Sequence, residues 1–335
     1  MNKNVDISNK TKVLNFLISE NRYISGTTLS NSLGISRQAI FKIIKQLKDE
    51  GLEILSIPQK GYQLKNIDKN IIIPSYIEYL LLENSIFSKC LFFKEIDSTQ
   101  SEAKKHARKN AKEGLIVIAN SQSNGRGRRN RKWENSDDSN LMFSLLLRPQ
   151  IPTTHIQILN LCVGIVIKKV LRNIYGINAT LKWPNDILVN GKKIAGILSE
   201  IAGDCDQIYY ALCGIGINVN SQEKDFPIEL QKTATSMRLI TGEFYSKSQV
   251  LINLLKVMGK YLVKLNEQDG IIKITEEYKS ECDTIGKMVE VIDDSNRYIG
   301  EAIEVRDNGE LCVLTQDKTL INFSAADVVH LRLAR

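Results

Sequence analysis

Cysteine and histidine are both scarce in this sequence. Its six cysteines are scattered and form no CxxC pair; they are Cys90, Cys162, Cys205, Cys213, Cys282 and Cys312. Only three histidines accompany them. This pattern argues against a zinc site and against a disulfide framework. We therefore expect reduced cysteines that fill apolar positions, as is usual for cytosolic proteins.

Long apolar runs are also missing. The N-terminal residues MNKNVDISNK contain none, so the sequence predicts neither a secretory signal nor a transit peptide. No segment reaches the roughly 18 consecutive apolar residues that are typical of a membrane span. We therefore expect a cytoplasmic protein without a membrane partner.

Positive charge is present in excess and is clustered. The 335 residues, enough for more than one domain, carry a formal net charge of +7. The stretch GRGRRNRKW, from Gly125 to Trp133, places five basic residues and two glycines in nine positions. Such clustering indicates an anionic partner without identifying it.

The first residues of the chain combine helical periodicity with turn signals. Gly34 can adopt the positive φ of a tight turn, Ser36 is a favourable N-cap for the next helix, and Gly51 can follow that helix at its end. Residues 54–57 and 61–64 read as two strands around a short tip. A helix, a glycine turn, a second helix and a hairpin predict a winged helix-turn-helix.

The second helix of this unit has an apolar stripe and a basic outer face. A basic face can be merely solvated, but the turn, the cap and the wing favour DNA binding. We expect Arg37 and Gln38 to reach base edges, and the lysines to bind phosphates. One such unit makes few contacts, so a dimer on a two-fold operator is expected. The predicted DNA-binding residues are Ser36, Arg37, Gln38, Phe41, Lys42, Lys45 and Lys60.

Strand-like and helix-like segments mix between residues 90 and 270. Consecutive strands dominate the second half, which favours a mixed sheet with helices to one side over a doubly wound sheet. The strand-like segments are 91–96, 114–120, 141–147, 179–186, 192–201 and 207–219, and the helix-like segments are 100–109, 156–175 and 247–267.

Four clusters of polar residues and glycines adjoin these strands, where loops often converge on a ligand. Taken singly they are ambiguous. GIGIN fits a bulge or tight turn, KWPND fits a proline turn, and the arginine run fits an RNA-binding patch. The clusters are DSTQ (97–100), SQSNGRGRRNRKW (121–133), KWPND with GKKIAG (182–196), and GIGIN (214–218).

The last fifty residues read as short alternating strands. Asp307-Asn308-Gly309 between two of them is a strong hairpin signal. A small SH3-like barrel fits this pattern. No catalytic constellation is evident in this region.

Taken together, GRGRxxRxW, KWPND and KKIAGIL resemble the bifunctional biotin protein ligases, which are also biotin operon repressors. The resemblance covers the whole chain and implies an α+β protein. Its domains would be a winged helix-turn-helix over 1–65, a linker and connecting helix over 66–84, a class II synthetase-like mixed α/β ligase domain over 85–280, and an SH3-like barrel over 281–335.

The resemblance also implies an activity and its partners. Biotin and ATP would form biotinyl-5′-AMP, and biotin would then pass to a lysine of a biotin carboxyl carrier domain. Two anions must meet in the first step, so cationic side chains and Mg²⁺ bound to the phosphates are expected. Biotinyl-5′-AMP would also promote a homodimer that binds operator DNA and represses biotin synthesis or uptake genes.

Site residues follow from the same resemblance, motif by motif. Lys193, Arg128 and Arg126 would be catalytic, and Asp186 would help to hold Mg²⁺. Biotin would be bound by Ser98, Thr99, Gln100, Gln122, Arg126, Gly127, Arg128 and Lys193. ATP and the adenylate would be bound by Gly125, Arg128, Arg129, Trp133, Lys182, Asn185, Asp186 and Asn218.

Two departures and two alternatives accompany this interpretation. Many relatives have Asn at the position of Gln100, so the sequence does not fix which contact Gln100 makes. Many have Gly at the position of Asn130, so the sequence does not fix how the loop closes there. The alternatives are a ligand-sensing regulator without ligase activity and a lipoate ligase. The intact GRGRR and KWPND motifs and Lys193 argue against the first alternative. Lipoate ligases lack both the Gly-Arg loop pattern and the winged helix.

Overall fold

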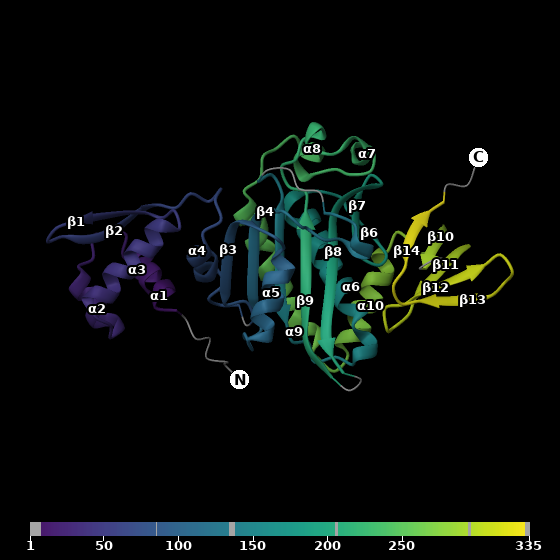
Figure 1. Cartoon of the computed structure of the whole chain (residues 1–335), viewed down its shortest axis with the longest axis horizontal. Helices are drawn as coiled ribbons and strands as arrows, with labels where there is room; N and C mark the ends of the chain where they lie inside the picture. Colours follow the sequence, from purple (N-terminus) through teal and green to yellow (C-terminus); the bar gives the residue numbers. More distant parts are fainter. Residues whose placement is uncertain (1–7, 85, 134–137, 205–206, 294–295, 332–335) are drawn as a thin grey trace.

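Three bodies lie in a row along the long axis of the molecule (Figure 1). A small helical unit stands at the N-terminal end, a large sheet with helices forms the middle, and a smaller sheet stands at the C-terminal end. The computed structural model describes residues 8–84, 86–133, 138–204, 207–293 and 296–331.

The N-terminal unit is a helix-turn-helix followed by an antiparallel hairpin, as predicted. The Ser36 hydroxyl accepts a hydrogen bond from the Ala39 amide and caps the second helix of the motif, while Gly34 (φ 66°) makes the turn before it. Gly51 follows that helix at φ 105°, as expected. Its elements are α1 (Asn9–Glu20), α2 (Gly26–Leu33), α3 (Arg37–Asp49), β1 (Glu53–Ile57) and β2 (Gly61–Asn66).

The short helix α4 (Pro74–Leu80) connects this unit to the central sheet, and it begins at Pro74 as the sequence predicts. Glu78 on α4 bridges the two bodies. One of its carboxylate oxygens accepts a hydrogen bond from the Thr11 hydroxyl of α1 at 2.9 Å, and the other accepts from the Cys90 amide at 3.0 Å. Cys90 belongs to the first strand of the central sheet, so Glu78 ties the N-terminal unit directly to that strand.

The central sheet is mixed, as predicted. The strand order is β3-β4-β5-β9-β8-β7-β6; β3 and β4 are parallel, and the remaining pairs are antiparallel. Its strands are β3 (Lys89–Ile96), β4 (Leu115–Gln122), β5 (Leu141–Leu147), β6 (Thr180–Lys182), β7 (Asp186–Val189), β8 (Lys192–Gly203) and β9 (Ile208–Ile217).

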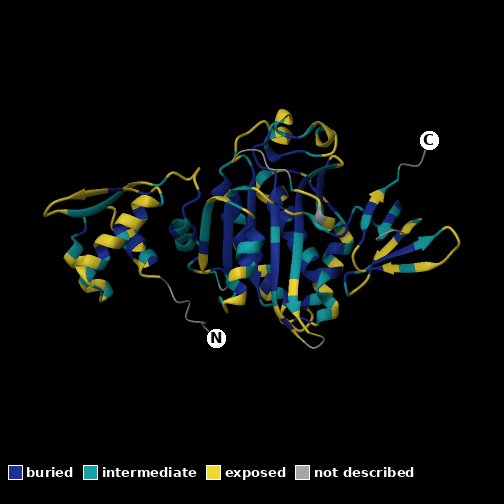
Figure 2. Cartoon of the chain, in the orientation of Figure 1, coloured by how far each residue is buried: buried dark blue, intermediate teal, exposed yellow. Residues whose placement is uncertain are grey.

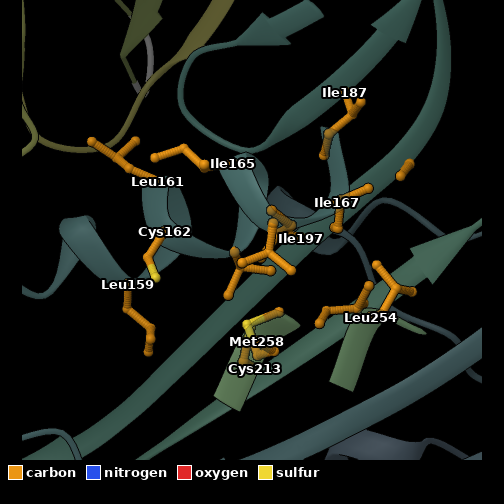
Figure 3. Packing of buried hydrophobic residues seen from close by; sticks show 14 of the residues in the cluster. Leu159, Leu161, Cys162, Ile165, Ile167, Ile187, Ile197, Cys213, Leu254 and Met258 are labelled. Atoms are coloured by element: carbon orange, nitrogen blue, oxygen red, sulfur yellow. The ribbon is translucent and has the colours of Figure 1, made fainter. Parts of the chain in front are cut away.

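One face of this sheet packs against three helices, and the main core lies between the sheet and these helices (Figures 1 and 3). In this core Ile197 and Cys213 from the sheet lie close to Ile165 of α6 and Met258 of α9. Two of the helices were predicted, and the third was not. They are α6 (Gln157–Tyr175), α9 (Lys247–Leu265) and α10 (Gly270–Glu281).

The opposite face of the sheet carries a helix that the sequence analysis misplaced. We expected helices on one side only, but α5 (Thr99–Arg108) packs its Ala103 and Ala107 on Leu146 and Leu212 of the other face. The reason is that β5 is apolar on both faces, since both Leu145 and Leu146 are fully buried. A strand of this kind needs cover on each side.

Helix α6 is long and apolar and lies inside the molecule. By length and composition alone, the stretch Thr153–Tyr175 could cross a membrane, but 67% of its most apolar window is buried in the protein. Figure 2 shows this helix and the strands that it covers largely in the colour of buried residues. It is therefore a core helix of the central domain.

The C-terminal residues form a five-stranded antiparallel sheet of order β13-β12-β11-β10-β14. The predicted hairpin at 307–309 joins two of its strands, with Gly309 at φ 88°. The Trp183 indole donates to the Gly309 carbonyl at 2.9 Å and ties this sheet to the central one. The strands are β10 (Met288–Asp293), β11 (Asn296–Val305), β12 (Leu311–Thr315), β13 (Leu320–Phe323) and β14 (Asp327–His330), of which β14 was not predicted.

Candidate active site

Three adjacent strands provide the floor of a cavity on the face that α5 covers only in part. Alternate residues of β5, β9 and β8 point to this face, because side chains alternate along a strand. In register, Gly214 lies between Ser144 and Leu198, and Gly216 lies between Met142 and Gly196. GIGIN is thus a regular strand whose glycines face the cavity, and not the bulge or turn that it resembles when taken alone.

The cavity has a volume of about 500 Å³, a size suited to a small-molecule ligand. All four sequence clusters reach it, although they come from distant parts of the chain. The predicted site residues that line it are Ser98, Thr99, Gln100, Gln122, Arg126, Gly127, Arg128, Trp133, Lys182, Asn185, Asp186, Lys193 and Asn218. Gly125 and Arg129 are not among the lining residues.

One end of the cavity is uncharged and already hydrogen-bonded. The Thr99 amide and hydroxyl both donate to Gln122 Oε1, at 2.7 and 3.1 Å, and the Thr99 and Ser144 hydroxyl oxygens lie 2.8 Å apart. Ser98 caps α5 by accepting from the Ser101 amide. These short polar side chains are buried, so this end can take an uncharged polar group only by matching donors with acceptors.

The other end of the cavity is charged and centres on Lys193. Its Nζ lies 2.6 Å from Asp186 Oδ1 and 5.6 Å from the centre of the Trp133 ring. The Lys193 amide donates to the Thr233 carbonyl, and its carbonyl accepts from the Thr235 amide, so the backbone of this lysine is held from both sides. A cation on so fixed a backbone is well placed to bind an anionic ligand.

The Gly-Arg loop brings further cations to this end. Its Arg128 guanidinium donates to Asn185 Oδ1 at 3.3 Å and to the Ala326 carbonyl at 3.1 Å. Burial lowers the pKa of Arg128, and the neighbouring carboxylates of Asp327 and Asp186 act in the opposite direction. Arg128 is thus a half-buried cation that links the loop to the KWPND motif and to the C-terminal sheet.

Two other arginines of the loop point to the C-terminal sheet. Arg131 pairs with Asp327 at 2.6 Å, and Arg129 donates to the Ile292 carbonyl at 2.7 Å. The left-handed conformation in this turn falls on Arg129, at φ 53°. Of these two arginines Arg131 also lines the cavity, and Arg129 does not.

Trp133 lies flat on the glycines of the floor. A Cβ at Gly216 would come within 2.5 Å of the Trp133 ring, and one at Gly196 would come within 3.0 Å. Glycine is therefore needed at both strand positions for the indole to approach the sheet. Gly216 belongs to the GIGIN motif and Gly196 to the KKIAG motif, so both motifs pack against Trp133.

A further wall of the cavity was missed by the sequence analysis. Phe226, Leu230, Thr233 and Ala234 line it from the segment that follows GIGIN. The segment contains a 3-10 helix at Glu223–Asp225 and the short helices α7 (Ile228–Gln231) and α8 (Met237–Thr241), and no periodic pattern marks it. Asn218 holds it in place by donating its side-chain amide to the Thr235 carbonyl at 2.9 Å.

A histidine of the C-terminal sheet lies beside the charged end. His330 Nε2 is 3.0 Å from the Thr284 hydroxyl, which accepts from the Trp183 amide. Burial lowers the pKa of His330 to about 4, and the charges of Lys182 and Lys287 contribute to this shift. Burial also lowers the pKa of Lys182 itself. His330 is therefore neutral at pH 7 and held in a cationic surrounding.

We expect His330 to make folding stability sensitive to acid. The histidine pKa is about 4 in the folded chain and 6.5 in the unfolded chain, so the unfolded chain binds more protons between these values. Stability should therefore fall as the pH drops below about 6.5. Between pH 7 and pH 5 the wild type should lose about 1–2 kcal/mol more than His330→Gln. Urea unfolding at both pH values measures this, and equal losses in both proteins would contradict it.

The predicted DNA-binding residues lie on α3, at its N-cap and at the hairpin tip. Every one of them is exposed, and the buried side of α3 is its apolar stripe of Ile40, Ile44 and Leu47. Phe41 is 62% exposed in the middle of the basic face. The Lys48 ammonium donates to the Ser56 hydroxyl and so links α3 to the hairpin.

Known proteins resemble this chain along most of its length. The Biotin/lipoate A/B protein ligase family matches residues 92–218, and an HTH domain family matches residues 9–63. The bifunctional ligase/repressor BirA of Bacillus spizizenii is 35% identical over 297 residues, which are 88% of this chain and 90% of that protein. The Escherichia coli protein of the same name is 29% identical over 306 residues, 90% of this chain and 91% of that protein.

A solved structure shares the fold of about three quarters of this chain. The biotin protein ligase of Aquifex aeolicus, in complex with biotin and ATP, aligns with a TM-score of 0.63 and 30% identity, over 73% of this chain and all of that one. The two family matches, the near full-length relatives and this shared fold agree with one another. This chain therefore belongs to the family of bifunctional biotin protein ligases that are also biotin operon repressors.

Proposed function

We propose that this protein joins biotin to ATP to form biotinyl-5′-AMP, and then transfers biotin to a lysine of a biotin carboxyl carrier domain. The observation that carries this proposal is the division of one cavity into an uncharged polar end and a cationic end. An elongated ligand with a polar ring and a carboxylate tail, activated by a phosphate, matches both ends. The family membership supports the same ligand.

The binding roles follow from this division. Ser98, Thr99 and Gln122 would hold the ureido ring, since their hydroxyl and amide groups can supply both donors and acceptors. At the other end Arg126, Gly127, Arg128 and Lys193 would hold the biotin carboxylate and the α-phosphate.

The nucleotide would lie beside the loop and the KWPND motif. Trp133, Lys182, Asn185, Asp186 and Asn218 line this part of the cavity. Gly125 would shape the loop, because the Trp133 amide donates to its carbonyl at 3.1 Å. Arg129 would act indirectly, by fastening the loop to the C-terminal sheet.

Mg²⁺ fits this site only together with the phosphates. No group of three or more His, Cys, Asp or Glu among the described residues could hold a metal alone. Asp186 is a carboxylate that lines the cavity, and one carboxylate with substrate phosphates is a usual way to bind Mg²⁺. When bound, the ion would neutralise phosphate charge.

The chemistry requires two anions to approach each other. A carboxylate oxygen of biotin attacks the α-phosphorus, and pyrophosphate leaves. Lys193, Arg126 and Arg128 would stabilise the charge that develops on the phosphate oxygens, which is the main contribution that fixed cations make to such a step. The acceptor amine then attacks the acyl carbon of the adenylate, and AMP leaves. The loop would exclude water from this labile intermediate.

Regulation would use the other end of the molecule. Arg37, Gln38 and the lysines of α3 and of the hairpin would bind operator DNA, in a homodimer promoted by biotinyl-5′-AMP. The units would be 1–65, 66–84, 85–280 and 281–335, with a class II synthetase-like core and an SH3-like C-terminal barrel. We place this activity in the cytoplasm, where carboxylases and operator DNA occur together.

Incubation with α-labelled ATP, Mg²⁺ and either biotin or lipoate tests the proposal. With biotin, and without a carrier domain, the protein should form a bound adenylate and release pyrophosphate. When a carrier domain is added, it should become biotinylated and AMP should be released. Adenylate formation with lipoate instead of biotin would overturn the substrate. DNA binding without any adenylate formation would indicate a regulator that is not a ligase.

A further inference from the structure

A buried lysine of α9 contacts the chain on both sides of the Gly-Arg loop. This loop follows β4, and the chain returns to the sheet at β5. The Lys247 ammonium donates to Asn120 Oδ1 of β4 at 3.4 Å, and it pairs with the Asp138 carboxylate shortly before β5. Lys247 is only 7% exposed although it is charged. One amine from a helix that is remote in the sequence thus lies where the chain leaves the sheet and where it returns.

The strand register shows why a bridge matters at this point. The pairing of β4 with β5 ends at Ala119 and Met142, and Asn120 is the next residue of β4. β4 itself continues beside β3 as far as Gln122, which lines the cavity. The two strands therefore separate here, and Lys247 connects their chain segments beyond the last pair.

The backbone that carries this lysine is fixed to the returning segment. The Asn220 side chain donates to the Tyr245 carbonyl at 2.8 Å and accepts from the Tyr245 amide at 2.9 Å. The Asn220 amide donates to the Ser139 carbonyl at 2.9 Å. Because Tyr245 lies two residues before Lys247, the lysine starts from a fixed base beside the residue that follows Asp138.

Stability alone does not explain why a charge is buried here. Burial lowers the pKa of Lys247, and the hydrogen bond and charge of Asp138 act in the opposite direction. Removing an ion pair from water costs desolvation free energy, so a buried pair adds little net stability over an apolar side chain of similar size. What the pair adds is a fixed geometry, because the lysine must meet two oxygen atoms from separate parts of the chain.

We propose that Lys247 is a positioning residue, which holds the two ends of the Gly-Arg loop segment together so that Arg126 and Arg128 face the ligand. Both arginines line the cavity, whereas Lys247 is not among the lining residues. Lys247 therefore acts through the loop and does not touch the ligand. This inference rests on the proposed function, since it takes the loop as the part that holds the biotin carboxylate. A small displacement of the loop would weaken its contacts with the ligand together.

Biotinylation of a carrier domain by the full-length protein, with biotin varied and ATP saturating, tests the proposal. Lys247→Met removes the ammonium but keeps an unbranched side chain. It should raise the KM for biotin about 10- to 100-fold, as for a small misplacement of a binding group, and lower kcat by a smaller factor. Lys247→Arg keeps a cation that can reach both partners, so it should restore most of the wild-type KM.

Lys168→Met is the matched control. Lys168 is a buried lysine of α6 that pairs with Glu281 of α10, and it is not among the residues that line the cavity. Burial lowers the pKa of Lys168 as well. Its replacement removes the same charge from a similar environment. A variant that is merely less stable has fewer active molecules, which lowers kcat and leaves the KM unchanged, so Lys168→Met should keep the wild-type KM for biotin.

Each contrary result has a distinct meaning. An unchanged KM in folded Lys247→Met, or an equal rise in Lys168→Met, would overturn the proposal. Wild-type protein that does not biotinylate the carrier would refute the proposed function itself. If circular dichroism shows that Lys247→Met is unfolded, Asp138→Asn carries the test. The Asp138 side chain is 61% exposed, and asparagine tolerates the left-handed backbone at this position (φ 48°). Its KM for biotin should also rise, and an unchanged value would overturn the proposal.

Discussion

Lys193→Met is expected to slow formation of biotinyl-5′-AMP by about 10²–10³-fold, which is the usual loss when one fixed group that stabilises transition-state charge is removed. Lys193 lines the cavity, and its Nζ lies 2.6 Å from Asp186 Oδ1. The variant therefore loses a cation where the biotin carboxylate and the α-phosphate must meet. The side chain is partly exposed, and its loss should leave the fold intact. Pyrophosphate release under single-turnover conditions measures the effect.

Lys192→Met is the matched control. Lys192 is the preceding residue on the same strand and is similarly half-buried, but its ammonium donates to the Gln231 carbonyl and does not line the cavity. Replacing Lys192 should change the rate of biotinyl-5′-AMP formation by less than about three-fold, because substitutions outside a binding site usually have small effects. Equal slowing in both variants would mean that general positive charge, and not the position of Lys193, assists the reaction.

Arg37→Ala is expected to abolish selective operator binding and to leave ligation intact. Arg37 is exposed at the start of α3, where a recognition helix meets base edges. One base contact contributes about 1–3 kcal/mol to operator binding. A two-fold dimer loses this contact in both half-sites, so the affinity for the operator should fall about 30- to 10⁴-fold. Fluorescence anisotropy on an operator and on a scrambled duplex, with biotin and ATP present, measures both losses.

Arg22→Ala controls for charge in the same unit. Arg22 is exposed but pairs with Glu20 at 2.8 Å, outside α3. Its loss should weaken binding to both duplexes slightly and equally. If Arg37→Ala behaves in the same way, Arg37 binds phosphate and does not read sequence. If ligation is lost with Arg37, the two functions are not separable at this residue.

Local signals explain how much of the fold could be predicted. The Ser36 cap, the Gly34 turn and the Pro74 start each depend on a few neighbouring residues, and the structure has them where expected. The unpredicted elements lack such signals. Strand β14 is only four residues long, and α10 contains a charged run, EEYKSE, that obscures its apolar face. Short or mixed segments acquire their structure from partners that are distant in the sequence.

The same distinction applies to the candidate site. Sequence by itself determined its ingredients: a glycine- and arginine-rich loop, the KWPND motif with Lys193, a DSTQ helix start and paired strand glycines, and with them the family. Only the tertiary structure decided what these residues do to one another. It seats Trp133 on Gly196 and Gly216, engages Arg131 with Asp327, and leaves the Gln100 amide unpaired over Gly214. The physical reason is that burial and hydrogen bonding depend on contacts between distant segments, which no local pattern of residues encodes.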